Sequence, residues 1–371
     1  STSADLEDKF QYPLFGRTIP SDSGNAVPII QFLHEVLGIT HLAVLNVNDA
    51  YGNSFVQGLR VAAEKHAPAM NIHQVSIDEQ IASIRTALNS IKATQYQVIF
   101  TILFSPETHD AVLNMAYEIG IAGTGHHQWI FADSFDKITG RKMEANSPLH
   151  LAYRGSSMLD ATGGIPGIGL VGYETLLESL RELNNPEDMD YIFKVGPKYD
   201  GNKIYEESLT QFPDYFMDTF DSVQIPFIYE ATIALGLGAC GALDDNLFLD
   251  GEKHYKTLVN SKFGGINGAV VFDPSTGTKD PKYTLYKVTN FFDQPSSEAG
   301  MVEFKEAVTH IYRDGKWTER TQYIFNDGTS QLPLDIPPPN VQDDTVHRAV
   351  LIAVLVLCAL ALILGGGLMA W

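Results

Sequence analysis

The chain of 371 residues carries 45 acidic and 25 basic side chains, which gives a net charge of −20 at pH 7. Such an excess of carboxylates argues against a nucleic-acid partner, whose phosphates require lysine and arginine, and against docking on anionic lipid. The only two cysteines, Cys240 and Cys358, argue against a disulfide framework.

Residues 23 to about 135 alternate between helical and strand patterns. Apolar side chains recur at helical spacing over 25–37, 53–66 and 81–91. Strand patterns lie at 41–47, 71–77, 98–104 and 128–133. Ser105-Pro106-Glu107 supplies the cap, the first-turn proline and the acid that begin a further helix. These repeated units with apolar strands predict an α/β fold, in which helices cover both faces of a parallel sheet.

The second half of the chain is less regular. The periodicity fades over 136–160, and helical patterns return at 171–183 and 225–240. A strand is predicted at 269–273, after a glycine-rich turn, and β structure at 282–292 and 310–320. An Asp-Gly pair predicts a turn within the last of these segments.

The end of the sequence predicts membrane attachment. Residues 349–371 contain no charged side chain, and their 23 positions exceed the roughly 20 that a helix needs to cross a bilayer. We therefore expect one transmembrane helix there. Residues 332–348 begin with a proline-rich, acidic run and are predicted to form an extended stalk.

Three motifs suggest catalysis or metal binding, and none satisfies its pattern. The G-x-G-x-x-G match at 167–172 lacks a strand directly before it, because Pro166 stands there. His126 and His127 have no further ligand at metal-binding spacing, and 273–280 fails the calcium-loop spacing. The sequence therefore predicts no enzyme, no metal and no cofactor.

Two residues remain as candidates for a binding site, Tyr51 and Asp133. Each directly follows a predicted strand of the sheet, and open α/β sheets bind ligands at the carboxyl ends of their strands. A tyrosine ring and a carboxylate together suit a small amine or an amino acid. Spacing alone leaves open that Tyr51 packs a turn and that Asp133 caps the next helix.

The same segments resemble a known ligand-binding fold. The sequences FGRTIPSDSGNAV (15–27), the Asp-x-Tyr-Gly turn (49–52) and WIFADSF (129–135) are similar to the Venus-flytrap region. Periplasmic amino-acid-binding proteins, natriuretic-peptide receptors and class C G-protein-coupled receptors share that region. The resemblance continues at 225–235, 263–277 and 283–291. It implies a periplasmic-binding-protein-like fold.

This resemblance also implies roles for the two candidates. In amino-acid-sensing members, the matching tyrosine stacks near the ligand and the matching aspartate binds its amine. Tyr51 and Asp133 occupy those positions, although Phe135 replaces the usual tryptophan. Phe135 therefore leaves the class of ligand open.

The resemblance further implies a division of the chain. Residues 1–14 would be an incomplete N-terminal segment, since the family carries much of its first lobe before this point. Residues 15–150 would form lobe 2, and 151–331 the remaining region with hinge crossings and part of lobe 1. The stalk at 332–348 and the transmembrane helix at 349–371 follow.

No cysteine lies between 292 and 348, where most class C receptors carry a cysteine-rich module. The sequence therefore most resembles a metabotropic GABA receptor ectodomain. That implies an extracellular region of a membrane receptor, which senses an amino acid or small amine by lobe closure and forms a dimer. A membrane-tethered solute-binding protein, a single-span receptor with an intracellular enzyme, and a truncated dimerisation partner remain open.

Overall fold

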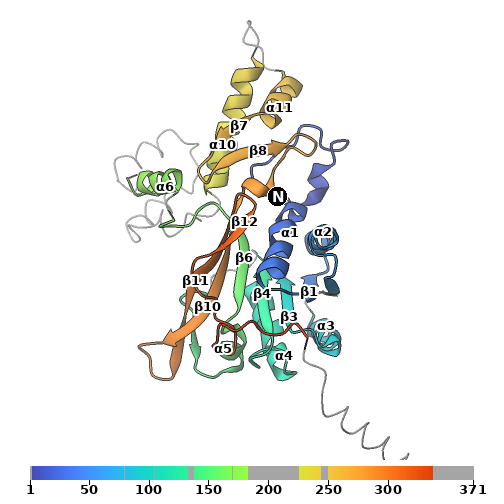
Figure 1. The fold of residues 1–371 in the computed structure, drawn as a ribbon, viewed down its shortest axis with the longest axis vertical. Coiled ribbons are helices and arrows are strands. Elements are labelled where there is room, and N and C mark those ends of the chain that lie inside the picture. The colour runs from blue at the N-terminus through green and yellow to red at the C-terminus, as the bar shows by residue number, and fades with distance from the viewer. Residues whose placement is uncertain are drawn as a thin grey trace, which may run out of the picture.

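The computed structural model describes residues 2–78, 80–103, 105–132, 138–168, 170–182, 225–243 and 250–336. A large sheet forms the centre of the molecule, and a small subdomain lies beyond one end of its strands (Figure 1). The small subdomain consists of α10 (Ile225–Ala242), α11 (Gly251–Val259) and a sheet of β7 (Lys262–Gly264), β8 (Ala269–Asp273) and β9 (Thr278–Lys279).

The large sheet has the strand order β12-β11-β10-β6-β4-β3-β1-β2, with β5 paired to β11. The parallel strands are β2, β1, β3, β4 and β6, in that order across the sheet. The antiparallel pairs are formed by β5, β10, β11 and β12. The bounds are β1 (His41–Val47), β2 (Asn71–Ile77), β3 (Val98–Ile102), β4 (Gln128–Ala132), β5 (Lys142–Glu144), β6 (Ser157–Thr162), β10 (Leu285–Pro295), β11 (Met301–Arg313) and β12 (Lys316–Glu319).

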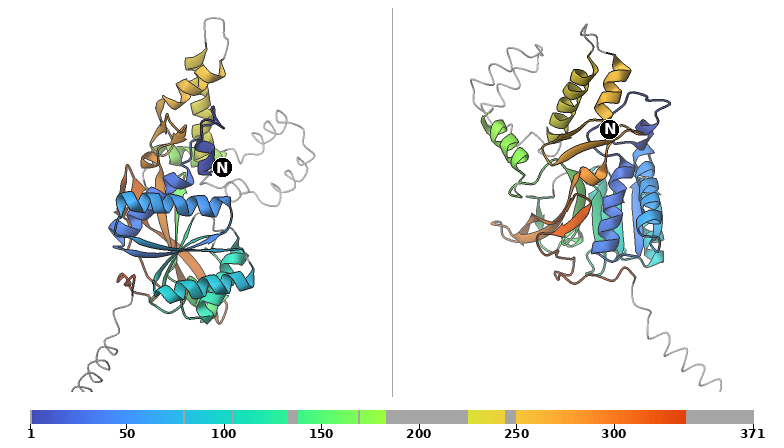
Figure 2. Two further views of the ribbon diagram at one scale, coloured as in Figure 1. Left: turned by 90° about the vertical axis from the view of Figure 1, so that its right-hand side faces the viewer. Right: turned by 45° about the horizontal axis from the view of Figure 1, so that its top comes forward.

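Helices cover both faces of this sheet, as Figure 2 shows with the helices on either side of the fanned strands. One face carries α1 (Asp22–Gln31), the π-helical turn η2 (Phe32–Val36) and α2 (Ala50–His66), and the other carries α3 (Ile81–Thr94), α4 (Pro106–Glu118) and α5 (Pro148–Tyr153). Side chains alternate along β1, so Leu42 and Val44 join the core under α1 and α2. Ala43 and Leu45 join the core under α3 and α4. The predicted α/β fold class is thereby confirmed.

Most elements of the first 135 residues were also predicted correctly. Strands β1 and β2 coincide with the predicted 41–47 and 71–77. Ser105 caps α4 by accepting a hydrogen bond from the Thr108 amide at 3.1 Å, with Pro106 in the first turn. Elements that had not been predicted include β5, α5, β6 and α11, and the short strands β7 and β9.

Within the described residues, α10 is the one helix long and apolar enough to cross a membrane. It packs against α11, and its Glu230 is buried beside Lys279 of β9. We therefore assign α10 to the small subdomain, although only 33% of its apolar stretch is buried and Ile228, Leu235 and Leu237 are exposed. The transmembrane helix predicted at 349–371 lies outside the described residues.

Two distant segments pair where the small subdomain joins the large sheet. The Arg17 amide donates to the Gly277 carbonyl, and the Lys279 amide donates to the Arg17 carbonyl, each at 3.0 Å. The large sheet itself continues past residue 150, through β6 and β10 to β12. The division of the chain into lobes at 150 remains a prediction.

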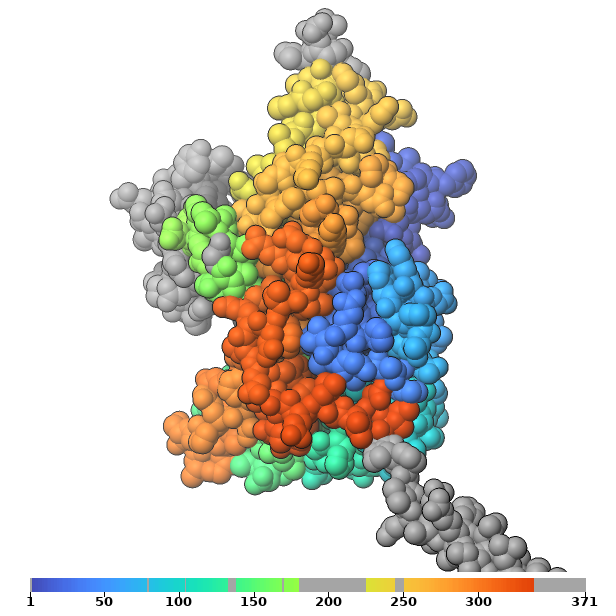
Figure 3. Space-filling model, in the orientation of Figure 1, coloured from blue at the N-terminus to red at the C-terminus, as the bar shows by residue number. Residues whose placement is uncertain are grey.

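The last described residues, 320–336, form an irregular segment that we call the strap. It runs along the amino ends of the parallel strands, and its surface lies beneath the first helices in Figure 3. Tyr323 and Phe325 are buried in the core under α1 and α2. The side-chain amide of Asn326 donates to the carbonyls of Leu151 and Arg154, at 2.9 and 2.6 Å. Residues 332–336, the start of the predicted stalk, therefore lie on the surface of the domain.

Candidate functional site

The candidate site lies at the carboxyl ends of the parallel strands, the edge of the sheet that faces the small subdomain (Figure 1). Strand β1 has β2 on one side and β3 on the other, so the direction of winding reverses beside it. Open α/β sheets bind ligands at such a switch point. The structure therefore places the turn after β1 where a ligand site is expected.

That turn has a tight and specific geometry. The Asp49 carboxylate caps α2 by accepting a hydrogen bond from the Gly52 amide at 2.7 Å. A Cβ atom on Gly52 would lie 2.3 Å from the Val47 carbonyl oxygen, closer than real contacts allow. Asp49 and Gly52 thus allow the chain to pass directly from β1 into α2.

Tyr51 lies in the first turn of α2, at this edge, as the sequence predicted. Its ring is partly buried and meets Phe55 edge-on, with 5.8 Å between ring centroids. Phe55 in turn lies 6.3 Å from Phe100 of β3. This row of rings fixes Tyr51 against the core, which limits its motion and would favour a preformed site.

Asp133, the second predicted residue, and Phe135 lie outside the described residues. The structure gives the strand that leads to Asp133, since β4 ends at Ala132. Only β3 separates β4 from β1, so the ends of those two strands are about 10 Å apart. A ligand of amino-acid size could span that distance.

His109 adds a neutral side chain near the same edge, which the sequence reasoning missed. Its Nδ1 lies 2.9 Å from the Ser105 carbonyl oxygen, and its ring meets Phe131 of β4 edge-on. Burial lowers the pKa of His109 to about 4, although the Ser105 carbonyl and the Asp110 carboxylate act in the opposite direction. The imidazole is therefore uncharged at neutral pH and donates its Nδ1 proton to Ser105.

A small cavity lies behind Tyr51 and Phe55. Its volume is about 10 Å³, enough for one water molecule. The Tyr286 hydroxyl donates to the Asn25 side-chain oxygen at 2.9 Å beside it. The lining residues are Asn25, Ile29, Phe55, Leu159, Asp160, Ala161 and Tyr286. Sequence reasoning could not find this polar pair, because 261 positions separate its two members.

A larger groove of about 540 Å³ lies on the outer side of α1 and α2. Small side chains such as Ala50, Ser54 and Gly58 line it, together with Val61 and Lys65. Tyr51 does not line this groove. This groove is therefore separate from the candidate site, despite its size.

The motifs that the sequence reasoning set aside have structural roles in the described residues. The Gly167 amide donates to the Glu174 carboxylate at 2.8 Å, which puts an acidic group where a nucleotide phosphate would have to bind. The Asp273 carboxylate accepts a hydrogen bond from the Ser275 amide in the turn between β8 and β9. His127 pairs with Thr124 at 2.9 Å, and no cluster of three metal-binding side chains occurs among the described residues.

Comparison with known proteins agrees with this fold. A sequence model of the receptor family ligand binding region matches residues 1–290. The chain is also 24% identical over 344 residues to the metabotropic glutamate receptor-like protein E of Dictyostelium discoideum. That alignment covers 90% of this chain and 36% of the relative, so the chain spans about a third of the relative's length.

Proposed function

The chain belongs to the family of receptor ligand-binding regions, and from that membership we propose that it binds an amino acid or a related small amine. The ligand would lie at the carboxyl ends of β1 and β4. Tyr51 would contact the ligand with its ring or hydroxyl, and Asp133 would accept hydrogen bonds from its ammonium group. The relative is described as metabotropic glutamate receptor-like, which supports an amino acid as the ligand class.

The observation that carries the proposal is the turn after β1. Asp49 and Gly52 hold Tyr51 at the switch point of the sheet, and the Phe55 ring supports it from behind. A packing tyrosine could lie anywhere on α2. A tyrosine in the first turn, at the edge facing the small subdomain, is in the place where this type of sheet binds ligands.

The proposal includes attachment to a membrane and action as a receptor of the GABA-B type. The apolar residues 349–371 would anchor the chain, with the described domain outside the cell. Ligand binding would favour closure of the small subdomain over the large sheet, in a dimer whose membrane parts respond to that closure. No catalytic step is part of this function.

Calorimetric titration of the full chain with single amino acids and amines tests the ligand class. The panel should include L-glutamate, glycine and γ-aminobutyrate. We expect at least one compound to bind saturably, and Tyr51→Ala to weaken its binding by about tenfold or more. Asp133→Asn should weaken binding of the same compound.

Tyr96→Ala is a matched control, because Tyr96 is also partly buried and meets a ring edge-on, that of His41, at the amino end of β1 opposite the proposed site. It should bind the ligand as the wild type does. Failure of every compound in the panel would reject the amino-acid proposal. Equal loss in Tyr51→Ala and Tyr96→Ala would reject the role of Tyr51.

A further inference from the structure

The strap ends in a contact that fixes the chain to one strand of the large sheet. One carboxylate oxygen of Asp335 accepts hydrogen bonds from the Thr40 amide at 2.7 Å, the Thr40 hydroxyl at 2.8 Å and the His41 amide at 2.9 Å. The Asp335 carbonyl also accepts a hydrogen bond from the Gln97 amide at 2.9 Å. One residue therefore binds the amino ends of both β1 and β3.

These donors give Asp335 a specific binding site. Burial by itself would raise the pKa of Asp335, but hydrogen bonds from Thr40 and His41 outweigh it and hold the pKa below its usual value. His41 Nδ1 lies 3.4 Å from the same oxygen. The carboxylate is thus charged at neutral pH, and hydrogen bonds to a charged acceptor are stronger than those to a neutral one.

The position of this contact relates it to the candidate site. Strand β1 begins at His41, beside Asp335, and ends at Val47, just before the Asp49 cap and Tyr51. Seven residues of strand span about 23 Å, so one straight element connects the two ends. On either side, β2 and β3 pair with β1 in register, which makes the connection rigid.

We propose that Asp335 is a positioning residue that clamps the outgoing chain to β1, so that the connector toward the membrane moves as one body with the strand that carries Tyr51. The clamp itself is independent of any ligand. Its use in signalling rests on the proposed function. Without it, the chain after Asp335 would lose this attachment to the sheet, and movement of the large sheet would be transmitted poorly.

Hydrogen exchange on the full chain, without ligand, tests the clamp. Asp335→Ala should speed exchange of the Thr40, His41 and Gln97 amides by about tenfold or more, because each loses its acceptor or its fixed neighbour. Asp327→Ala is the matched control. Asp327 lies in the same strap but is exposed, and among the described residues its carboxylate accepts hydrogen bonds from Thr329 alone.

Distances between two spin labels test whether the clamp orients the connector. The labels would be placed at Asn89, on the exposed side of α3, and at Asn340, five residues after Asp335, with Cys240 and Cys358 replaced by serine. We expect a narrow distance distribution in the labelled parent protein and in Asp327→Ala, and a clearly broader one in Asp335→Ala.

Unchanged exchange in Asp335→Ala, or a parent distribution as broad as that of the variant, would overturn the proposal. A circular-dichroism melt of each variant shows whether the sheet is intact. If Asp335→Ala unfolds, Asp335→Asn replaces it, because the amide retains an acceptor oxygen without the charge. Since no ligand is used, a negative result here leaves the binding proposal standing, and absence of ligand binding leaves the clamp standing.

Discussion

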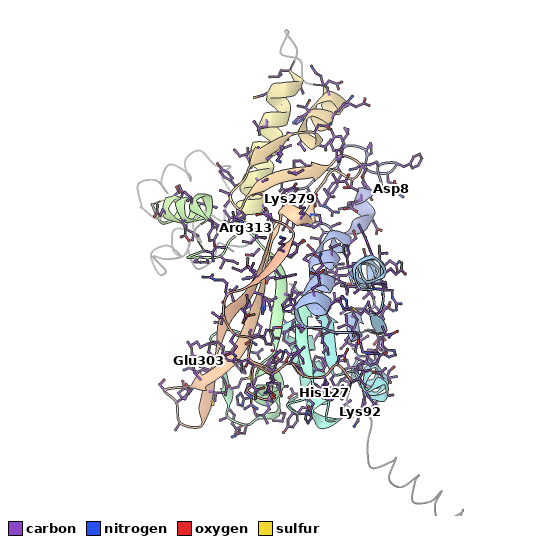
Figure 4. All side chains as sticks on the ribbon, viewed as in Figure 1. Asp8, Lys92, His127, Lys279, Glu303 and Arg313 are labelled. Atoms are coloured by element: carbon purple, nitrogen blue, oxygen red, sulfur yellow. The ribbon has the colours of Figure 1, made fainter. Side chains whose placement is uncertain are left out.

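Lys279 reaches from β9 to Glu230 of α10, and its Nζ lies 2.6 Å from the carboxylate oxygen with both side chains almost wholly buried, at 1% and 0% exposed. The Lys279 ammonium also lies over the Phe227 ring, 5.6 Å from its centroid. Figure 4 labels Lys279 where the small subdomain meets the large sheet. This pair therefore ties α10 to the segment that connects the two parts.

Removing one partner of this pair should destabilise the protein strongly. Glu230→Ala leaves a buried ammonium without its counter-charge, which costs about 3–5 kcal/mol in the free energy of unfolding. The double change Glu230→Leu with Lys279→Met should be less destabilising than Glu230→Ala, because it leaves no buried charge. Urea denaturation measures all three proteins.

The exposed pair of Arg85 and Glu118 is the control for this series, because both side chains are at least half exposed. Arg85→Ala should leave the denaturation midpoint nearly unchanged. A double variant that is no more stable than Glu230→Ala would show that the pair contributes through shape and not through charge.

Two helical glycines should respond to alanine with opposite signs. Gly52→Ala should destabilise by roughly 1–3 kcal/mol, since the added methyl group would meet the Val47 carbonyl at 2.3 Å. Gly236→Ala on α10 meets no atom within 4 Å and should stabilise by up to about 1 kcal/mol. Thermal unfolding compares the two, and a neutral Gly52→Ala would contradict the close turn after β1.

Stability should fall as the pH drops from about 6.5 toward 4, in part because of His109. Burial lowers the pKa of His109 to about 4 in the folded protein, against an ordinary value of 6.5. The unfolded chain therefore binds a proton within this range that the folded chain does not. This removes at most about 3 kcal/mol of stability by pH 4, and none above pH 6.5.

The change His109→Asn isolates that contribution, because asparagine can still donate a hydrogen bond to the Ser105 carbonyl. The variant should lose less stability than the wild type between pH 6.5 and 4, as measured by urea denaturation at several pH values. His127 retains its own dependence, since burial first, and then the charges of His126 and Lys92, lower its pKa to about 4 (Figure 4). Equal slopes in the two proteins would show that folding does not lower the pKa of His109.

Membrane attachment should depend on residues 349–371 and not on α10. A chain without 349–371 should remain in the aqueous phase after carbonate extraction, whereas the full chain should sediment with the membranes. Leu235→Arg on the exposed side of α10 should not change the partition of the full chain. Release by Leu235→Arg would instead identify α10 as a membrane-embedded helix.

The first 135 residues could be predicted well because local patterns decide their structure. The apolar run of β1 is buried on both faces, and Ser105 with Pro106 determines where α4 begins. The Asp-Gly pair also predicted the turn at Asp314 and Gly315. Both residues adopt the left-handed conformation that tight hairpins require.

The elements that could not be predicted depend on distant partners. Strand β6 contains Ser157, Asp160 and Thr162, whose burial comes from pairing with β4 and β10 and not from any apolar pattern. The same holds for the site, where Tyr51 was found from a local turn but the pair of Asn25 and Tyr286 was not. The role of Asp335 could not be predicted from its proline-rich surroundings, because its hydrogen-bond partners lie almost 300 positions earlier.

The strap also determines where this domain can be cut for expression. A protein truncated at residue 331, where the sequence suggested that a free stalk begins, would keep Tyr323 and Asn326 but lose Asp335. The amides of Thr40 and His41 would then lose their acceptor at the start of the strand that leads to Tyr51. A boundary at or beyond Ile336 retains the Asp335 contacts, and binding studies on a shorter fragment would confuse loss of the strap with loss of affinity.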